Sequence, residues 1–318
     1  VTDALGCQSN ATSNINYGPQ ISGSVDVLIT PCQGYSTGSV KFSPLLSGNG
    51  GLTYLWNNGQ TTQTLTNLAT GNYTTTVTDS KNCQYQTSAI LGEYTLPTAS
   101  LTGTTSICSG NSTLLTISLT GTAPWNIIYN EGITPVAVNN INTSPYTFSV
   151  SPTSTTVYSI TSVSDSHCNG TNFGTTATVT VNPRPTSSIS GSATICNGSS
   201  TTLSIALTGS QPWSQTYTDG TTPVVVSGIA ASPYTFSVSP SVPTNYTVTA
   251  LSDANCTALA GDMTGSAAVA INPRPIPTIT GLISVCANSM GNIYITETGM
   301  TGYIWSISGG TTVSGGGA

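Results

Sequence analysis

The stretch Ser144-Pro145-Tyr146-Thr147-Phe148-Ser149-Val150 returns unchanged as residues 232–238, 88 residues further along the chain. Its Tyr, Phe and Val alternate with small hydroxyl residues, which is typical of a strand with one buried face. Further landmarks recur at the same spacing: Cys108 and Cys196, Pro124-Trp125 and Pro212-Trp213, Asp165 and Asp253, and Cys168 and Cys256. A repeat of this length has the size of a domain, so we expect tandem domains, each with its own core.

Short alternating runs within each repeat predict strands. Residues 146–150, 157–163 and 176–181 are examples, and clusters of Gly, Pro, Asn and Ser separate such runs every 8 to 12 residues or so. This spacing predicts an all-β fold in which each repeat is an antiparallel β-sandwich of about seven strands. Proline-rich joints near Leu96-Pro97, 183–185 and 273–275 predict an extended rod of such domains.

The composition excludes several classes of function. Only 4 of the 318 residues are Lys or Arg and the net charge is -6, so the chain cannot build the basic surface that nucleic-acid binding needs. No run of 18 apolar residues is present, so we predict no membrane span. No motif indicates a cofactor, and the eight Cys contain no Cys-x-x-Cys pair that would indicate a zinc site.

The cysteines recur once early and once late in each repeat. Pairing them within repeats predicts three intradomain disulfides, Cys32–Cys83, Cys108–Cys168 and Cys196–Cys256. Such bonds imply an oxidising compartment. Cys7 and Cys286 are left over: Cys7 follows Val1-Thr2-Asp3 as Cys83 follows residues 77–79, and Cys286 lies where an early cysteine belongs. We therefore expect both to be unpaired by truncation, in a window from a longer protein.

The first complete repeat carries a set of motifs in fixed order. They are Trp56-x-x-Gly59, Leu65-x-x-Leu68, Gly71-x-Tyr73 and Asp79-x-x-x-Cys83. In this combination residues 16–97 resemble the SprB repeat, a module named for the giant gliding-motility adhesin of Bacteroidetes. Residues 98–275 resemble the immunoglobulin-like or PKD-like modules of very long surface proteins exported by the type IX system, and residues 303–310 resemble the start of another PKD-like module.

This resemblance implies a division of the chain and a location. Residues 1–15 would be the end of one SprB-like module and 16–97 a complete one. Two immunoglobulin-like sandwiches, 98–185 and 186–275, would follow, with 276–318 as the first part of a PKD-like module. The implied protein is extracellular, at the cell surface.

Two residue types recur once per repeat. We expect Trp56, Trp125, Trp213 and Trp305 to pack in the cores beside the disulfides, the alternative being exposed rings that stack on sugars. Asp3, Asp79, Asp165 and Asp253 each precede a late cysteine by three or four residues. We expect them to accept backbone hydrogen bonds within a turn, because one carboxylate per loop is too few for a calcium site.

Catalysis is not predicted. His167 is the only histidine, and Asn255 stands at its position in the next repeat. Since adjacent side chains of an extended segment point to opposite faces, we do not expect Asp165, Ser166 and His167 to form a catalytic array.

Two non-catalytic functions therefore remain, a stalk or spacer of a cell-surface adhesin and a subunit of an extracellular filament. A passive stalk for an enzyme encoded elsewhere in the parent protein is a third. The expected partners are neighbouring modules of the same chain, with identical chains added in a filament, and a surface or glycan ligand is left unidentified.

Overall fold

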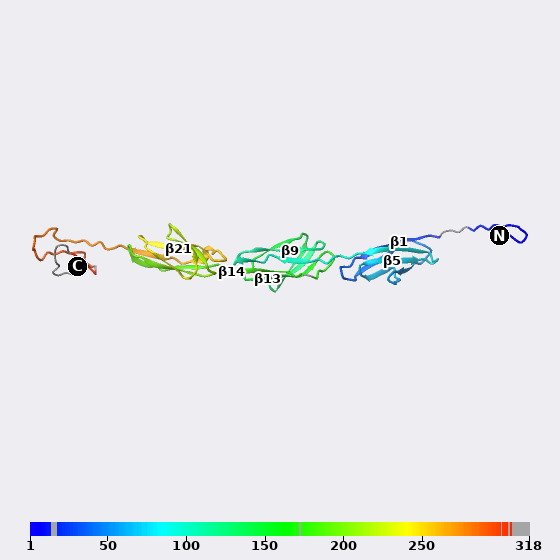
Figure 1. The fold of residues 1–318 in the computed structure, drawn as a ribbon, viewed down its shortest axis with the longest axis horizontal. Coiled ribbons are helices and arrows are strands. Elements are labelled where there is room, and N and C mark those ends of the chain that lie inside the picture. Colours follow the sequence, from blue (N-terminus) through cyan, green and yellow to red (C-terminus); the bar gives the residue numbers. More distant parts are fainter. Residues whose placement is uncertain (14–17, 172, 300, 305, 307–318) are drawn as a thin grey trace. The chain divides into compact units, whose positions relative to one another are not determined.

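The computed structural model describes residues 1–13, 18–171, 173–299, 301–304 and 306. Their regular structure consists of strands and one short 3-10 helix, η1 (Ala260–Asp262). The chain divides into two compact units, Val1–Asn182 and Pro183–Ala318. The first unit contains two β-sandwiches and the second contains one, each around its own hydrophobic core (Figure 1). The predicted all-β fold of tandem immunoglobulin-like sandwiches is confirmed.

The first sandwich contains two three-stranded sheets. One has the order β1 (Ile21–Ile29), β2 (Gly38–Ser47), β4 (Thr64–Leu68), and the other has the order β3 (Thr53–Trp56), β5 (Gly71–Thr78), β6 (Gln84–Leu91). Alternate residues of these strands face inward, as Val40 and Phe42 of β2 illustrate. They meet Trp56, Leu65 and Val77 in a closed core.

The second sandwich pairs a five-stranded sheet with a three-stranded one. The larger sheet has the order β11 (Thr134–Ile141), β10 (Trp125–Glu131), β13 (Thr156–Ser164), β14 (Thr176–Asn182), β8 (Thr105–Cys108). The smaller has the order β12 (Tyr146–Val150), β9 (Thr113–Leu119), β7 (Ala99–Thr102). The stretch that recurs in the sequence is therefore an edge strand, whose partner is β9.

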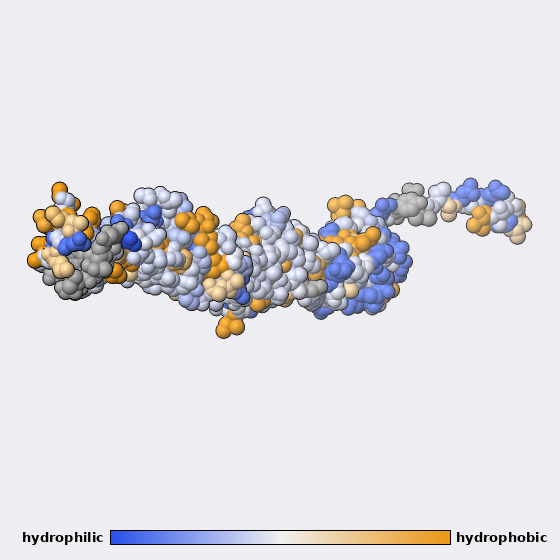
Figure 2. Space-filling model, turned by 60° about the vertical axis from the view of Figure 1, so that its left-hand side comes forward, coloured by the Kyte–Doolittle hydropathy of each residue, from blue (hydrophilic) through white to orange (hydrophobic). Residues whose placement is uncertain are grey.

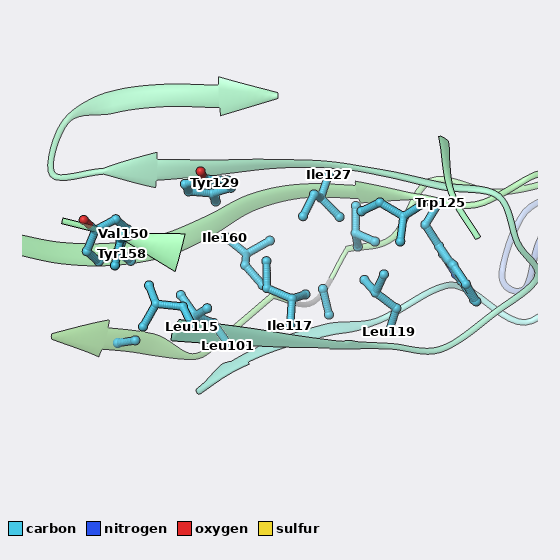
Figure 3. Close-up of a cluster of buried hydrophobic side chains, with 14 of the residues drawn as sticks. Leu101, Leu115, Ile117, Leu119, Trp125, Ile127, Tyr129, Val150, Tyr158 and Ile160 are labelled. Atoms are coloured by element: carbon cyan, nitrogen blue, oxygen red, sulfur yellow. The ribbon is translucent and has the colours of Figure 1, made fainter. Parts of the chain in front are cut away.

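Apolar side chains from both layers fill the second sandwich. Figure 3 shows Leu115 and Ile117 of β9 pointing towards Ile127 and Ile160 of the facing sheet, with Trp125 at one end of the cluster. Leu115 and Ile117 are completely buried. Removing so much apolar surface from water is the main source of stability for a sandwich of this kind.

The third sandwich, in the second unit, repeats this plan. One sheet has the order β20 (Tyr234–Val238), β17 (Thr201–Leu207), β15 (Ser187–Ser190), β22 (Met263–Thr264). The other has the order β16 (Ala193–Cys196), β23 (Ala267–Asn272), β21 (Thr244–Ser252), β18 (Trp213–Thr218), β19 (Pro223–Ile229). β17, β20 and β21 begin 88 residues after β9, β12 and β13.

In each sandwich a cysteine lies beside the end of the last strand or the residues just after it. β8 runs parallel to β14 and aligns Cys108 with Asn182, and β16 runs parallel to β23 and aligns Cys196 with Asn272. In the first sandwich an isolated parallel bridge aligns Cys32 with Tyr94. These three cysteines, which we call the strand cysteines, therefore lie at the end where the chain leaves its sandwich.

In Figure 2 the visible surface of the second and third sandwiches is mostly pale, which corresponds to intermediate hydropathy, whereas that of the first sandwich also shows blue hydrophilic and orange hydrophobic areas. Thr and Ser side chains of the outward strand faces account for this, since only 4% of the residues are charged. The surface is polar but nearly uncharged.

Candidate functional site

One disulfide links the first sandwich to the second. Cys32 and Cys168, 136 residues apart in sequence, are bonded with an S–S distance of 1.97 Å and a Cα–Cα distance of 5.9 Å. Beside the bond, the ring of Tyr94 stacks on that of His167, with centroids 3.8 Å apart and an interplanar angle of 25°. Tyr94 follows β6 and His167 precedes Cys168, so both contacts join the same two sandwiches.

This bond shows that the predicted pairing of the cysteines is wrong. Cys32–Cys83 and Cys108–Cys168 are wrong, because Cys32 and Cys168 bond to each other, while Cys83 is an exposed free thiol. Cys196–Cys256 is wrong as well: Cys196 is an exposed free thiol, whereas Cys256 is disulfide-bonded. Cys108 is also disulfide-bonded. The idea of one intradomain disulfide per sandwich therefore fails. Cys7 and Cys286 carry exposed free thiols.

The length of the strands explains the error. Cys108 lies opposite the end of β14, next to the Thr156 end of β13, because Thr156 pairs with Val179. Cys168 lies at the other end of β13, where Asn169 bridges to Ser164. A nine-residue strand separates its ends by roughly 25–30 Å, whereas a disulfide needs Cα atoms within about 7 Å. The two cysteines of one sandwich are therefore too far apart to bond.

Backbone hydrogen bonds fix the position of Cys32. The N–H of the next residue, Gln33, donates to Tyr94 O at 2.8 Å, and the N–H of Tyr35 donates to Cys32 O at 2.9 Å. Tyr94 N donates in turn to Pro31 O at 2.9 Å. Sequence reasoning did not single out Tyr94, because it lies outside the quoted motifs and its role depends on a partner 73 residues away.

An aspartate fixes the position of Cys168. Asp165 Oδ1 accepts hydrogen bonds from the backbone N–H groups of His167 at 2.8 Å and Cys168 at 2.7 Å, and Asp165 N donates to Cys168 O at 2.9 Å. Its Oδ2 accepts from Thr122 N at 2.9 Å. The carboxylate thus holds a tight turn and ties it to the neighbouring loop.

The same turn occurs at the other three aspartates. Each Oδ1 accepts one hydrogen bond from the backbone N–H of the late cysteine and one from the backbone N–H of a residue just before it. The donors are Leu5 and Cys7 for Asp3, Lys81 and Cys83 for Asp79, and Asn255 and Cys256 for Asp253. We call Cys83, Cys168 and Cys256 the turn cysteines. Because backbone donors occupy these carboxylates, the turns do not offer a ready calcium site.

A glycine lies against the second carboxylate oxygen of Asp79, Asp165 and Asp253. A Cβ added at Gly121 would lie 2.5 Å from Asp165 Oδ2, one at Gly209 would lie 2.5 Å from Asp253 Oδ2, and one at Gly48 would lie 2.7 Å from Asp79 Oδ2. All three glycines have positive φ. A side chain there would collide with the aspartate, so Gly and Asp form a pair that sequence reasoning missed. Their constant spacing of 44 residues in the second and third sandwiches is a signal that could have revealed it.

These hydrogen bonds shift the acidity of the carboxyl groups. The backbone N–H of Asn49, with those of Cys83 and Lys81, lowers the pKa of Asp79 to about 2. Burial raises the pKa of Asp165, but the N–H groups of Thr122, Cys168 and His167 outweigh this effect and lower it below its ordinary value. The pKa of Asp253 is lowered in the same way, against the effect of burial. Asp79, Asp165 and Asp253 are therefore ionised near neutral pH.

Ser166 and His167 contact each other, contrary to the expectation for an extended segment. Ser166 Oγ lies 2.8 Å from His167 Nδ1, because these residues belong to a turn and not to a strand. Asp165, however, accepts from the backbone N–H of His167 and not from its ring. Ser166 Oγ also lies within hydrogen-bonding distance of Thr122 O, at 3.1 Å. Asp165 therefore does not orient the imidazole as the aspartate of a catalytic triad does.

The tryptophans lie inside the sandwiches. Trp56, Trp125 and Trp213 are only 2%, 8% and 8% exposed. Each indole N–H donates to a backbone carbonyl, that of Thr62, Thr120 and Thr208 respectively. Such rings offer no open face to a sugar. Trp305 lies outside the described residues.

Neither a metal cluster nor a membrane helix is evident in the described parts of the chain. Among those residues, no three His, Cys, Asp or Glu side chains gather closely enough to hold a metal ion. Likewise, no helix within them is long and apolar enough to cross a membrane.

Comparison with known proteins supports the fold of the second sandwich. Residues 96–173 match the family model of the immunoglobulin-like domain of nucleoporin POM152. No curated protein has a sequence that matches the chain significantly.

Solved structures of tandem domains are also similar to this chain. The I-band fragment I67–I69 of titin is 12% identical, and the match covers 82% of this chain and 100% of that one with a TM-score of 0.45. A fragment of a 1.5-MDa bacterial ice-binding adhesin is 15% identical, with the same coverage and TM-score. Immunoglobulin domains 1–5 of Sidekick-1 are 14% identical, covering 80% of this chain and 59% of that one, with a TM-score of 0.31.

Proposed function

We propose that the chain is a non-catalytic segment of the stalk of a large extracellular cell-surface adhesin and that it transmits tension. The observation that carries this proposal is the Cys32–Cys168 disulfide, which joins two consecutive sandwiches. Between them the main chain passes through a short joint, from Leu91 at the end of β6 to Ala99 at the start of β7. The disulfide connects the same two sandwiches as this joint. A pulling force on the chain is therefore carried by two covalent connections between them.

The chemistry of the joint supports an extracellular location. Disulfides persist in oxidising environments and are rare in the cytosol. The bond is held by backbone geometry on both sides, at Tyr94 and at Asp165, and has none of the surroundings of a redox-active Cys-x-x-Cys motif. It serves structure, as a stalk requires.

The nearly uncharged surface suits a spacer. With charges on only 4% of the residues, a module has little tendency to bind other molecules non-specifically through its charge. In this proposal the modules are residues 16–97, 98–185 and 186–275, with residues 1–15 and 276–318 as parts of their neighbours. The resemblance of 16–97 to the SprB repeat favours an adhesin of gliding or attachment, exported by the type IX system.

A filament subunit is the alternative function, and the edge strands favour it. In the second and third sandwiches the sheets end at β7, β8, β11, β12, β16, β19, β20 and β22, and none of these strands contains a charged residue. Charges on edge strands normally prevent strand addition between molecules. Because these edge strands contain no charges, identical chains could pair laterally through them.

Sedimentation velocity and small-angle scattering distinguish the two functions. Cys7, Cys83, Cys196 and Cys286 are first replaced by Ser, so that oxidation of the free thiols does not link molecules. For a stalk we expect an elongated monomer whose sedimentation coefficient and maximum dimension do not change with concentration. Polymers of regular width that grow with concentration would contradict the stalk and favour the filament.

A further inference from the structure

We propose that the Cys32–Cys168 disulfide diverts tension around most of the first unit, so that only β1 and β14 carry it. A chain pulled at its ends is held by its shortest covalent route. Within Val1–Asn182 that route runs along β1 to Cys32, across the disulfide to Cys168, and along β14. The inference rests on the proposed function for the source of the tension, whereas the bonded residues alone define the route.

In the first sandwich the chain enters and leaves through strands of different sheets. It enters through β1, in the sheet with β2 and β4, and leaves through β6, in the sheet with β3 and β5. Ile21 and Val25 of β1 and Leu91 of β6 pack in the same core. Without the disulfide, tension between the two ends would have to cross this core, whose apolar packing has no preferred direction.

The second sandwich has the same arrangement. The chain enters through β7 of the three-stranded sheet and leaves through β14 of the five-stranded sheet. Ala99 and Leu101 of β7 belong to one core with Ala177 and Val179 of β14. Tension along the main chain alone would therefore act between the two layers of both sandwiches.

The disulfide places both points of attachment of each sandwich on a single strand. Cys32 lies after the end of β1, and Cys168 lies before the start of β14. Tension then runs along these two strands and need not cross either core. A strand already rises about 3.3 Å per residue, close to the limit of about 3.6 Å for a fully extended chain, so β1 and β14 can lengthen little.

The bond also limits how far the unit can stretch. Cys32 and Cys168 are 136 residues apart, and the chain between them, with β2 to β13, is closed into a loop. If opened, this loop would add about 450–490 Å of extended chain. Residues 20–32 and 168–183 lie outside the loop and together reach at most about 105 Å. Even complete unfolding of both sandwiches would therefore lengthen the bonded unit by less than this limit.

Single-molecule force spectroscopy on the whole chain tests the route. The four exposed free thiols are first replaced by Ser, so that they do not exchange with the disulfide. An azide-bearing residue replaces Gln20 and another replaces Pro183, both of which are exposed, and each is coupled to a handle. Force then acts across the two sandwiches of the first unit.

The gain in contour length on unfolding is the quantity measured. With the disulfide intact we expect it to stay below about 105 Å. In C32S/C168S we expect it to increase by about 450–490 Å, because the loop is open. A gain above the limit in the bonded protein, or equal gains in the two proteins, would overturn the proposal.

C108S is the matched control. It also removes a disulfide-bonded cysteine, but one that lies inside the loop, so its gain should stay below about 105 Å. A longer gain in C108S would show that a bond of Cys108 limits the extension and would overturn the assignment to Cys32–Cys168.

Reduction of the unsubstituted bond gives a second measurement, which does not depend on the folding of C32S/C168S. Dithiothreitol converts the disulfide to two thiols and is itself oxidised to a cyclic disulfide. When it is added under force, the extension should grow by about 450–490 Å. Failure to grow, with loss of the disulfide verified by alkylation, would contradict the proposal.

These results are separable from the test of the stalk. Polymers in sedimentation would contradict the stalk and leave the route of tension within the unit unchanged. Conversely, a long gain in the bonded protein would overturn this route, while an elongated monomer would still support the stalk.

Discussion

Tyr94 stacks on His167 across the joint of the first two sandwiches, with ring centroids 3.8 Å apart. Cys32 Sγ lies 3.6 Å from the carbonyl oxygen of the same histidine, so ring stack and disulfide form one contact region. The third sandwich has Asn255 in place of His167. The stack is therefore a feature of the first joint, added to a turn that the repeats share.

Removing this stack weakens the Cys32–Cys168 bond without unfolding the sandwiches. Stacked aromatic pairs contribute about 0.5–1.5 kcal/mol, so in H167N we expect the equilibrium constant for forming the disulfide from glutathione to fall about 2- to 10-fold. Titration with redox buffers and alkylation of Cys32 measures it. Y94F is the matched control, since it keeps the ring and should behave as the native protein. An unchanged constant in H167N would mean that the stack contributes nothing.

Loss of the turn carboxylate destabilises the second sandwich. In D165A the N–H groups of Thr122, His167 and Cys168 lose their acceptor. Of these three donors the Cys168 N–H is partly buried and is left without an acceptor, whereas those of Thr122 and His167 are exposed to water. We expect the free energy of unfolding to fall by roughly 1–3 kcal/mol, measured by urea denaturation.

D219A is the control for D165A. Asp219 also accepts from two backbone N–H groups, those of Thr221 and Thr222, but in an exposed turn where water replaces the carboxylate. We expect a loss below about 1 kcal/mol. Equal losses in D165A and D219A would show that burial of the Cys168 N–H is not the cause.

The core of the third sandwich contains a polar defect. Gln215 is 1% exposed, and neither its Oε1 nor its Nε2 has a hydrogen-bond partner. Ile127 stands at the equivalent position of the second sandwich. We expect Q215I to stabilise the third sandwich by about 1–3 kcal/mol, as measured by calorimetry. The reciprocal variant I127Q should destabilise the second sandwich, and a destabilising Q215I would mean that the amide has a partner, such as a buried water.

Acid lowers the stability of the first sandwich through Asp79. The pKa of Asp79 is about 2 in the folded chain, against about 3.9 in an unfolded one. Because the pKa of Asp79 is lower in the folded state, the ionised carboxylate stabilises the fold fully at any pH above the unfolded pKa. This stabilisation disappears as the pH falls from about 4 through 2. In D79N the first sandwich should therefore show a flatter loss of stability between pH 5 and 2, measured by denaturation at each pH. If D79N lost stability between pH 5 and 2 as steeply as the native protein, this prediction would be contradicted.

Salt should have little effect on stability. With 4 basic and 10 acidic residues in 318, there are few charge interactions to screen. We expect the Tm to change by less than about 4 °C between low and high sodium chloride, which corresponds to about 0.5 kcal/mol for a domain of this size. A larger shift would reveal a coupled network of charges.

The sequence by itself determined the class of fold and the unit of repetition. Alternation in stretches such as 146–150 reports which face of a strand is buried, and this is a local property. The positions of Trp125 and Trp213 in the cores follow from the same pattern, because a large apolar side chain must be removed from water wherever the strand pairs. Because the sequence repeats after 88 residues, the same strands and the same buried positions recur in the next sandwich.

Only the tertiary structure decided which cysteines bond. Equal spacing of 60 residues between Cys108 and Cys168 and between Cys196 and Cys256 suggested bonds within each repeat. Spacing along the chain does not say at which end of a sandwich a residue lies. β13 and its neighbours place the strand cysteine and the turn cysteine a full strand length apart, and the fold instead brings Cys32 to Cys168 of the following sandwich. A disulfide forms only over a few ångströms, so three-dimensional proximity, and not the periodicity of the sequence, selects the partner.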